Sequence, residues 1–518
     1  MTSPEGGWGE FKLDGLKPGT AAKMLLAVCL LLSPQILMAD EIAARELANG
    51  DSLARDGKLD QARTAWRQVV ERYPDSQEAP TALDRLGTAA YPVEDFHLRG
   101  RTPGIDAERA LSIYRRIAEG HRTAPEAPRA LFKLGMLLSD PDVLFYNLDE
   151  SYGQFSALVT IYPESDYQDE GLYGLGDILA QQRQCPRAMA SLSRLDAEFP
   201  DSPWADDGLM LQADCLVRGG YREEAMRLYQ DLRDRFPQSP GATLARDRNT
   251  HLIRLLEAKS GPVYRQVHFI PVRLPEAWRV RAVTDMEVDP RGNIIISDGR
   301  AGLVHTLDRN GQPVSRTELR RPSAVWAGPD GLIIFADGRL VMGEQALSMI
   351  GPDGGPVVGP AGLLARDPEG RFIIWDRKSG DILRFTRRGR FDEVLVASRE
   401  FRIDAAVAGQ DGTIVVLDGK ALVAHEFMPG GGRREVPLQS DELRRPRHMS
   451  RDFLGNLYLL DTVARVLEMR APDGRLLVRL TSGRADGEPF PRPAGLAVNG
   501  RGDILIYDER RAGIVVYR

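Results

Sequence analysis

The chain has 518 residues, of which 42% are apolar and 27% are charged. This length predicts two to four domains at about 150 residues each, and the composition excludes a mainly disordered, collagen-like or multi-spanning membrane chain. The net charge of -6 argues against a general nucleic-acid binder, and it conceals an uneven distribution, since residues 40–258 carry -11 and residues 259–518 carry +5. The 51 glycines stand against only 7 histidines and 3 cysteines, a balance more typical of turn-rich repeats than of a metal enzyme.

Near the N-terminus, a short apolar run at Met24–Leu32 follows Lys23 and precedes a small residue, Ala39. This order is typical of a secretory signal cleaved near Ala39, so we expect residues 1–39 to be a signal region and the mature protein to be periplasmic or secreted. The run is shorter than the roughly 20 apolar residues of a membrane span, which makes an uncleaved anchor the less favoured alternative. Without that anchor, we expect membrane contact to be indirect. Translation that begins at Met24 is a further alternative.

Similar tetrapeptides recur through the first half of the chain, and the prolines of the last three are 37 residues apart. They are YPDS at 73–76, YPES at 162–165, FPDS at 199–202 and FPQS at 236–239. A period of this size predicts a solenoid of stacked helical hairpins, in which each unit buries its apolar face only against its neighbours. The proline of each tetrapeptide ends one helix, and its serine can cap the next.

Within each unit a small residue, an alanine, a large apolar residue and a proline follow one another at fixed spacing. The regular sets are Gly50, Ala62, Trp66 and Pro74; Gly176, Ala188, Leu192 and Pro200; and Ala213, Ala225, Tyr229 and Pro237. This spacing resembles the tetratricopeptide repeat, in which the small residue lets two antiparallel helices approach and the large residue fills the gap. Two further units, around Gly87 and Gly135, carry about 11 and 4 extra residues between their helices. The resemblance implies an all-α tetratricopeptide-repeat solenoid at residues 40–258.

The closing tetrapeptides are similar to those of the bacterial envelope subset of this family, which contains periplasmic adaptors without catalytic activity. Directly after the small residue of three units stand Asp51, Asp177 and Asp214, on the side that faces the concave groove in the family. Thr88 and Met136 interrupt this series. These acids are either ordinary residues of exposed helix faces or a ladder that binds amides or basic residues of a protein or peptide partner.

Two cysteines, Cys185 and Cys215, are left after the expected signal cleavage, and both lie in predicted helices. Buried free cysteines are common in such helices, whereas an exported chain can also form a disulfide. We expect two free thiols, with the disulfide as the alternative.

In the second half, a glycine, five mostly apolar residues and an aspartate occur six times at intervals of 39 to 47 residues. The segments are Gly292–Asp298, Gly331–Asp337, Gly370–Asp376, Gly412–Asp418, Gly455–Asp461 and Gly502–Asp508. Units of this size with several short strands predict an all-β, six-bladed propeller at residues 263–518, after a linker at 259–262. The sixth unit ends before its outer strand, and we expect the strand-like segment Val263–Val272 to supply it.

The six units resemble the NHL repeat, in which an aspartate follows the second strand of each blade. The resemblance implies the fold but no single activity, because the family includes RNA and protein binders as well as similar propeller lyases and lactonases. The first strand of each blade lines the channel, and the residues seven before the repeat glycines are Asp285, Ala324, Leu363, Ala405, His448 and Gly495. Asp285 and His448, with the nearby Asp404 and Arg447, are the candidate polar site at the channel mouth.

The sequence contains no phosphate-binding loop, nucleophile elbow or paired-cysteine metal motif, and the propeller histidines occupy unrelated repeat positions. We therefore expect no catalytic residues, metal or cofactor. The sequence favours an exported, non-catalytic scaffold that connects protein partners of the bacterial cell envelope and does not bind nucleic acid. The alternative is a propeller enzyme of the lyase or lactonase type, or a small-ligand sensor, with its site at the channel mouth.

Overall fold

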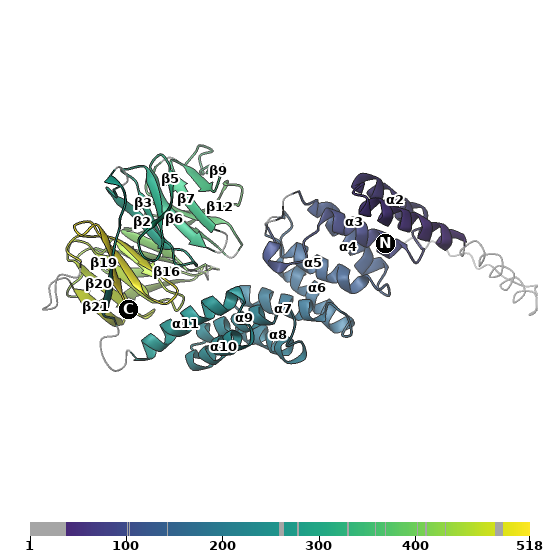
Figure 1. Cartoon of the computed structure of the whole chain (residues 1–518), viewed down its shortest axis with the longest axis horizontal. Coiled ribbons are helices and arrows are strands. Elements are labelled where there is room, and N and C mark those ends of the chain that lie inside the picture. The colour runs from purple at the N-terminus through teal and green to yellow at the C-terminus, as the bar shows by residue number, and fades with distance from the viewer. Residues whose placement is uncertain are drawn as a thin grey trace, which may run out of the picture. The chain divides into compact units, whose positions relative to one another are not determined.

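The computed structural model describes residues 38–257 and 264–518, apart from residues 101, 103, 142, 277–278, 329–330, 358, 368, 401, 410–411, 430 and 482–489. It contains a helical region followed by a six-bladed β-propeller, as the sequence predicts (Figure 1). The chain forms two compact units, Met1–Leu175 and Gly176–Arg518. The expected signal region, except for residues 38 and 39, and the expected linker at 259–262 lie outside the described residues.

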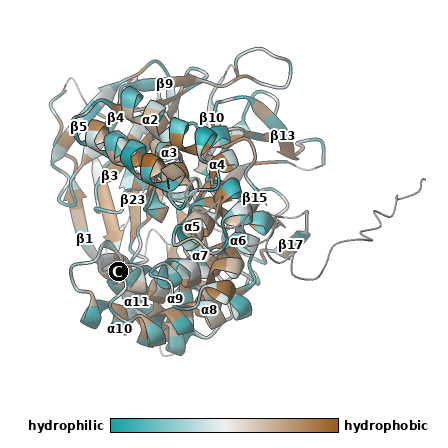
Figure 2. Cartoon of the chain, turned by 90° about the vertical axis from the view of Figure 1, so that its right-hand side faces the viewer, coloured by the Kyte–Doolittle hydropathy of each residue, from teal (hydrophilic) through white to brown (hydrophobic). Residues whose placement is uncertain are grey.

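The helical region consists of consecutive helices, and the four tetrapeptides lie in turns between them. In its described part, the compact unit Met1–Leu175 begins with a helix over residues 38–55. It continues with α2 (Leu59–Arg72), α3 (Ala79–Ala90), the 3-10 turn η1 (Phe96–Leu98), α4 (Ala107–Gly120), α5 (Ala127–Leu138), α6 (Leu148–Ile161) and the start of α7 (Gln168–Gln181). The last residues of α7 belong to the second unit, which continues with α8 (Cys185–Glu198), α9 (Ala205–Arg218), α10 (Arg222–Arg235) and α11 (Pro240–Glu257). The apolar side chains Ala225, Tyr229 and Leu232 of α10 are buried. Hydrophilic residues therefore dominate the visible surface of this helix (Figure 2).

Each small residue of the repeat lies against the large residue of its partner helix. A Cβ added to Gly135 would lie 2.5 Å from Cζ of Phe155, and one added to Gly176 would lie 2.3 Å from Leu192. Real Cβ atoms do not approach other atoms this closely, so a larger residue at these positions must displace the facing side chain. Gly50 with Trp66 and Gly87 with Tyr114 show the same relation. The predicted pairing of small and large residues is therefore confirmed.

The substitution Gly135→Ala tests this packing. We expect it to destabilise the helical region by about 1–3 kcal/mol, because the added methyl group must displace the Phe155 ring. Gly153→Ala in α6 is the matched control, since no atom lies within 4 Å of its added Cβ and alanine favours a helix by up to about 1 kcal/mol. Thermal melts followed by circular dichroism measure both, and equal melting temperatures for the two variants would contradict the packing.

The propeller consists of six four-stranded antiparallel sheets, each built from strands that are consecutive in the chain except in the last. The first blade is β2 (Val283–Val288), β3 (Ile294–Asp298), β4 (Leu303–Leu307) and β5 (Pro313–Glu318). The second is β6 (Pro322–Gly328), β7 (Gly331–Ala336), β8 (Arg339–Met342) and β9 (Gln345–Ser348), and the third is β10 (Ala361–Arg366), β11 (Phe372–Asp376), β12 (Ile382–Phe385) and β13 (Phe391–Val396). The fourth is β14 (Ala405–Ala408), β15 (Ile414–Asp418), β16 (Val423–Phe427) and β17 (Arg433–Pro437), and the fifth is β18 (His448–Arg451), β19 (Leu457–Asp461), β20 (Val466–Arg470) and β21 (Leu476–Thr481).

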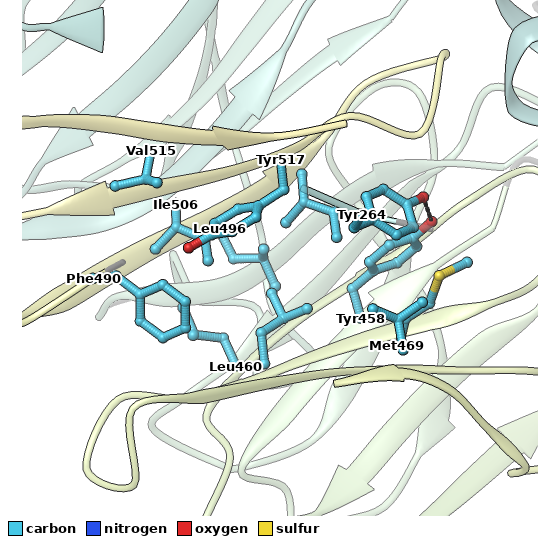
Figure 3. Packing of buried hydrophobic residues seen from close by; sticks show 12 residues of the cluster. Tyr264, Tyr458, Leu460, Met469, Phe490, Leu496, Ile506, Val515 and Tyr517 are labelled. Carbon is cyan, nitrogen blue, oxygen red and sulfur yellow. Dashed lines mark hydrogen bonds between the residues drawn. The ribbon is translucent and has the colours of Figure 1, made fainter. Parts of the chain in front are cut away.

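The sixth blade joins the two ends of the propeller. It contains β22 (Pro493–Val498), β23 (Ile504–Asp508), β24 (Gly513–Tyr517) and, as its outer strand, β1 (Gln266–Pro271). Because β1 pairs antiparallel with β24, the predicted role of the segment at 263–272 is confirmed for this strand. Tyr264, just before β1, lies in the same apolar cluster as Phe490 and Tyr517, and its hydroxyl oxygen is 3.5 Å from that of Tyr458 (Figure 3).

The repeat aspartates hold the blades by backbone hydrogen bonds. Asp461, at the end of β19, accepts through Oδ2 from the amides of Arg444 and Arg445 (2.7 and 2.6 Å), and through Oδ1 from those of Val463 and Ala464 (3.0 and 2.8 Å). One carboxylate thus ties the segment that enters the first strand to the turn that leaves the second. Asp298 and Asp508 also bridge these two segments. A buried carboxylate needs such donors, which explains why this position of the repeat is an aspartate.

Within the second unit, the last helix of the solenoid packs against blades five and six. The buried imidazole of His251 lies 2.7 Å from Oδ2 of Asp452, and Arg254 donates to Asp503 at 3.0 Å. Phe453 packs against the apolar cluster of α9, α10 and α11. Burial would raise the pKa of Asp452, but the bonds from His251 and Asn456 lower it. The propeller is therefore attached to α11 by buried polar and apolar contacts as well as by the chain. No helix among the described residues is long and apolar enough to cross a membrane.

Candidate ligand site at the channel mouth

The first strands of the six blades lie next to one another around the channel, in the order β2, β6, β10, β14, β18 and β22. Their registers place four of the expected channel residues at one level, because each of the four lies opposite the residue just before the repeat aspartate. The pairs are Asp285 with Ser297, Ala405 with Leu417, His448 with Leu460 and Gly495 with Tyr507, whereas Ala324 lies opposite Phe335, one position earlier in its repeat. Asp285 and His448 therefore come from different blades to the same end of the channel.

Asp285 connects the first two blades. Its Oδ1 accepts from the amide of Met286, and its Oδ2 accepts from the amide of Val325 in β6, both at 2.9 Å. The surrounding protein atoms raise the pKa of Asp285 to about 6, although these two amides and the nearby Arg377 act in the opposite direction. The surrounding atoms thus disfavour the charged form of this carboxyl group, although the residue is only half-buried.

Glu287 is a second carboxyl group on the same strand, which the sequence analysis did not single out. Residues two apart in a strand face the same side, so Glu287 accompanies Asp285. Burial and the charge of Asp285 raise the pKa of Glu287 to about 8. At neutral pH this side chain is mainly a carboxylic acid and can donate a hydrogen bond. The period of two along the strand was the signal that pointed to it.

Arg377 is the other residue that sequence reasoning missed. It follows the repeat aspartate of the third blade, where three other blades have glycine: Gly299, Gly338 and Gly419. Its guanidinium carbon lies 5.0 Å from the centre of the Trp375 ring, and a Cβ added to Gly362 in β10 would lie 2.6 Å from its Nε. Its charge reaches both Asp285 and His448, since it acts on the pKa of each. The break in the Asp-Gly pattern was the available signal.

His448 is a neutral imidazole in this surrounding. Burial, together with the positive charges of Arg377 and Arg447, lowers its pKa to about 4. A neutral ring offers one donor and one acceptor, and within the described part of the chain neither has a hydrogen-bond partner. The Arg447 side chain is exposed beside it.

Asp404 has a different position from the other three candidates. Its Oδ1 accepts from Arg402 and from Arg445 of the next blade, each at 3.1 Å, and its side chain is 5% exposed. The equivalent Thr284 also bonds the next blade, through the carbonyl of Pro322 at 3.2 Å. This position of the repeat therefore links neighbouring blades, and the structure brings Asp404 together with arginines rather than with Asp285 and His448.

The groove aspartates of the solenoid also have internal partners. Asp51 accepts from Nε1 of Trp66 at 3.0 Å and from Arg85 at 3.3 Å. Asp214 accepts from the Tyr229 hydroxyl at 2.8 Å and pairs with Arg248. Each of the two thus joins the large residue of its own unit to an arginine 34 positions further on. Asp177 is half-buried in α7.

The cysteines are free thiols in the structure. Burial and the adjacent Cys185 raise the pKa of Cys215 to about 12, so its thiol stays protonated. Among the described residues, no group of three or more His, Cys, Asp or Glu side chains is placed to hold a metal ion.

Taken together, the channel mouth offers a carboxyl pair, a neutral imidazole and two guanidinium groups from different blades. Such a set can bind a small polar molecule that carries an anionic group for Arg377 or Arg447 and hydrogen-bonding groups for His448 and Glu287. Shifted pKa values at several neighbouring groups are typical of functional positions.

The fold and the repeats define the class of protein, a tetratricopeptide-repeat solenoid followed by a six-bladed β-propeller. The tetratricopeptide repeat family model matches residues 50–76 and 207–239, so the helical region contains these repeats. No curated protein matches the sequence.

Several solved structures are similar to the propeller at low identity. A streptogramin B lyase is 11% identical with a TM-score of 0.36, over 49% of this chain and 97% of that one. Virginiamycin B lyase from Staphylococcus aureus is 10% identical with a TM-score of 0.35, over 47% and 81%. The calcium-binding protein regucalcin from Agrobacterium tumefaciens is 14% identical with a TM-score of 0.36, over 49% and 93%. At these values the likeness carries no argument about activity.

The substitution Asp285→Asn tests the channel mouth through pH. Burial raises the folded-state pKa of Asp285 to about 6. The free energy of unfolding of the wild type should therefore fall as the pH rises from about 4 to about 6, because Asp285 then ionises in a surrounding that disfavours its charge. The asparagine side chain cannot ionise, so the melting temperature of this variant relative to the wild type should rise from pH 4 to pH 7.

Asp308→Asn is the control of opposite sign. The amides of Gln312 and Asn310 lower the pKa of Asp308, so its charge stabilises the fold above its ordinary pKa and that contribution disappears in acid. Asp308→Asn should therefore melt below the wild type at pH 7. A difference between Asp285→Asn and wild type that stays constant from pH 4 to pH 7 would contradict a buried, costly carboxylate.

Proposed function

We propose that this protein is an exported, non-catalytic adaptor that holds protein partners together in the bacterial cell envelope. The observation that carries the proposal is the solenoid of tetratricopeptide repeats, a class of repeat that generally mediates protein interactions. Its units keep the small-to-large packing that fixes the curvature of such a solenoid, at Gly50, Gly87, Gly135 and Gly176. The apolar run and small residue before Asp40 support export.

The charge distribution supports separate partners for the two halves. Residues 40–258 carry -11 and residues 259–518 carry +5, so basic surfaces are favoured by the first half and acidic ones by the second. The propeller presents six repeated blades with variable turns, which is a surface typical of binding modules.

A small-ligand sensor, or a propeller enzyme of the lyase or lactonase type, is the second candidate, and the channel mouth favours it. Asp285 and His448 come there from different blades with shifted pKa values, and the charge of Arg377 acts on both. Arg377→Gly restores the residue that three other blades have at this position, so it removes the cation with little effect on folding. A thermal-shift screen of small carboxylates and phosphates against wild type and Arg377→Gly distinguishes the candidates. A compound that raises the melting temperature of the wild type but not that of Arg377→Gly supports the sensor or enzyme.

Site-specific photo-crosslinking in intact cells tests the adaptor. The photoreactive residue replaces Leu144 in the helical region or Val463 in the propeller, which are 85% and 80% exposed. We expect the mature chain to begin at Asp40 and to form defined adducts with envelope proteins, identified by mass spectrometry. The matched control is the same chain without residues 1–39, which should stay inside the cell and form none of these adducts. Identical adducts from both chains, or none from either position, would overturn the proposal.

A further inference from the structure

Residues 92–100, which belong to the extra residues of the second repeat, fold back onto the following repeats instead of forming a free loop. The extra residues run from the end of α3 to the start of α4 and contain η1, which Asp95 caps by accepting from the amide of His97 at 2.7 Å. The amide of Asp106 donates to the carbonyl of Ala90 at 2.9 Å, so the two ends of the excursion lie together. The repeat could therefore close without this segment.

The aromatic side chain of Phe96 is the main anchor of the excursion. It is 4% exposed, and its ring lies 6.0 Å from that of Phe132 in α5, 5.8 Å from Phe155 in α6 and 4.8 Å from Tyr173 in α7. Such edge-to-face and tilted contacts add to the gain from burial. Val93, three residues earlier, is a second buried anchor.

Charged groups hold the segment on both sides of Phe96. The buried Lys133 of α5 donates to the Val93 carbonyl at 2.6 Å and lies 3.1 Å from the carboxylate of Glu94. Arg99 donates to the Ser139 hydroxyl at 2.7 Å and lies over the Phe96 ring. Burial lowers the pKa of Lys133 to about 8 although Glu94 opposes this shift, so the lysine depends on a carboxylate beside it.

These contacts fall on the face of the solenoid where partners are expected. Phe132 and Tyr173 lie four residues before Met136 and Asp177, and residues four apart share one face of a helix. Met136 and Asp177 directly follow the small residues Gly135 and Gly176, the position that faces the concave groove in tetratricopeptide repeats. Residues 92–100 thus occupy the inner face of α5 and α7 as a bound peptide would.

We propose that residues 92–100 are a built-in ligand of this groove, and that a partner peptide of the same chemistry displaces them. The required pattern is an aliphatic anchor followed by an acidic residue, an aromatic anchor three residues after the aliphatic one, and a basic residue three further on. In this chain the pattern is met by Val93, Glu94, Phe96 and Arg99. The inference rests on the proposed role in protein binding, which it makes specific.

Displacement is physically reasonable for a segment of this kind. It has one helical turn of three residues, and Leu98, at 46% exposure, and His97 face outward. The amides of Leu98 and Arg99 donate to the carbonyls of Asp95 and Phe96 within the segment itself, so it can open locally without unfolding the solenoid. The groove would then present Lys133 and the aromatic rings to an incoming peptide.

A synthetic peptide, PVEDFHLRG (residues 92–100), tests the groove in isolation from any cell. The receptor is the full chain with residues 92–104 replaced by a short Gly-Ser linker, which the proximity of Ala90 and Asp106 allows. We expect this variant to bind the peptide at least about tenfold more tightly than it binds the same peptide with Phe96→Ala. We also expect it to bind the unchanged peptide more tightly than the wild-type chain does. A folded variant, judged by its helical circular dichroism, that does not distinguish the two peptides overturns the proposal.

Phe96→Ala in the otherwise intact chain keeps the test decisive if the linker variant fails to fold. With the photoreactive residue at Leu144, this variant should form its partner adduct in higher yield than the wild type. If the yield of this adduct is unchanged or lower, residues 92–100 are a permanent part of the solenoid, and the proposal that a partner displaces them is wrong. Loss of all adducts in both chains contradicts the adaptor instead, whereas peptide binding by the linker variant does not depend on the envelope partner.

Discussion

The burial of each repeat against the next is the constraint on which the rest of this structure depends. No helical hairpin and no single blade can bury its apolar face alone, so each unit needs a neighbour at a fixed distance. In the solenoid this distance is set where Gly135 meets Phe155 and where Gly176 meets Leu192. In the propeller, Asp285 and Asp404 join neighbouring blades through the Val325 amide and Arg445, and at the end of the ring β1 pairs with β24. The last helix of the solenoid, α11, is covered by the propeller, against which it packs through His251.

Both candidate sites are departures from these repeats. Arg377 occupies a position that is glycine in three other blades, and it brings a cation to Asp285 and His448 at the channel mouth. Residues 92–100 are extra to the second repeat, and they fill the inner face of α5 and α7 with Phe96. A repeat that is needed for folding leaves little freedom at its regular positions. Function is therefore expected where a residue departs from the repeat, as Arg377 and Phe96 do.

The sequence predicted the fold because repeats show their packing as spacing. The six Gly-to-Asp segments, the inner-strand level of Asp285 and His448 and the closing strand before the first blade all follow from counting. Contacts between distant, non-repeated residues leave no such trace. The pairs of His251 with Asp452 and of Arg99 with Ser139, and the approach of Arg377 to Asp285, depend on how the folded elements meet. Asp51 and Asp214 were predicted to be groove residues, because their spacing in the sequence does not show that each has an aromatic and an arginine partner.

Native-state hydrogen exchange followed by mass spectrometry tests most directly the claim that the segment at residues 92–100 is a displaceable ligand of the solenoid. At equilibrium the exchange rate of each amide reports the free energy of the opening that exposes it. We predict that the amides of residues 92–100 exchange through a local opening, far faster than those around Phe155 in α6, and that Phe96→Ala accelerates them further while α9 and α10 are unaffected. Exchange of residues 92–100 at the same rate as α6, with the two changing together in Phe96→Ala, would contradict this account.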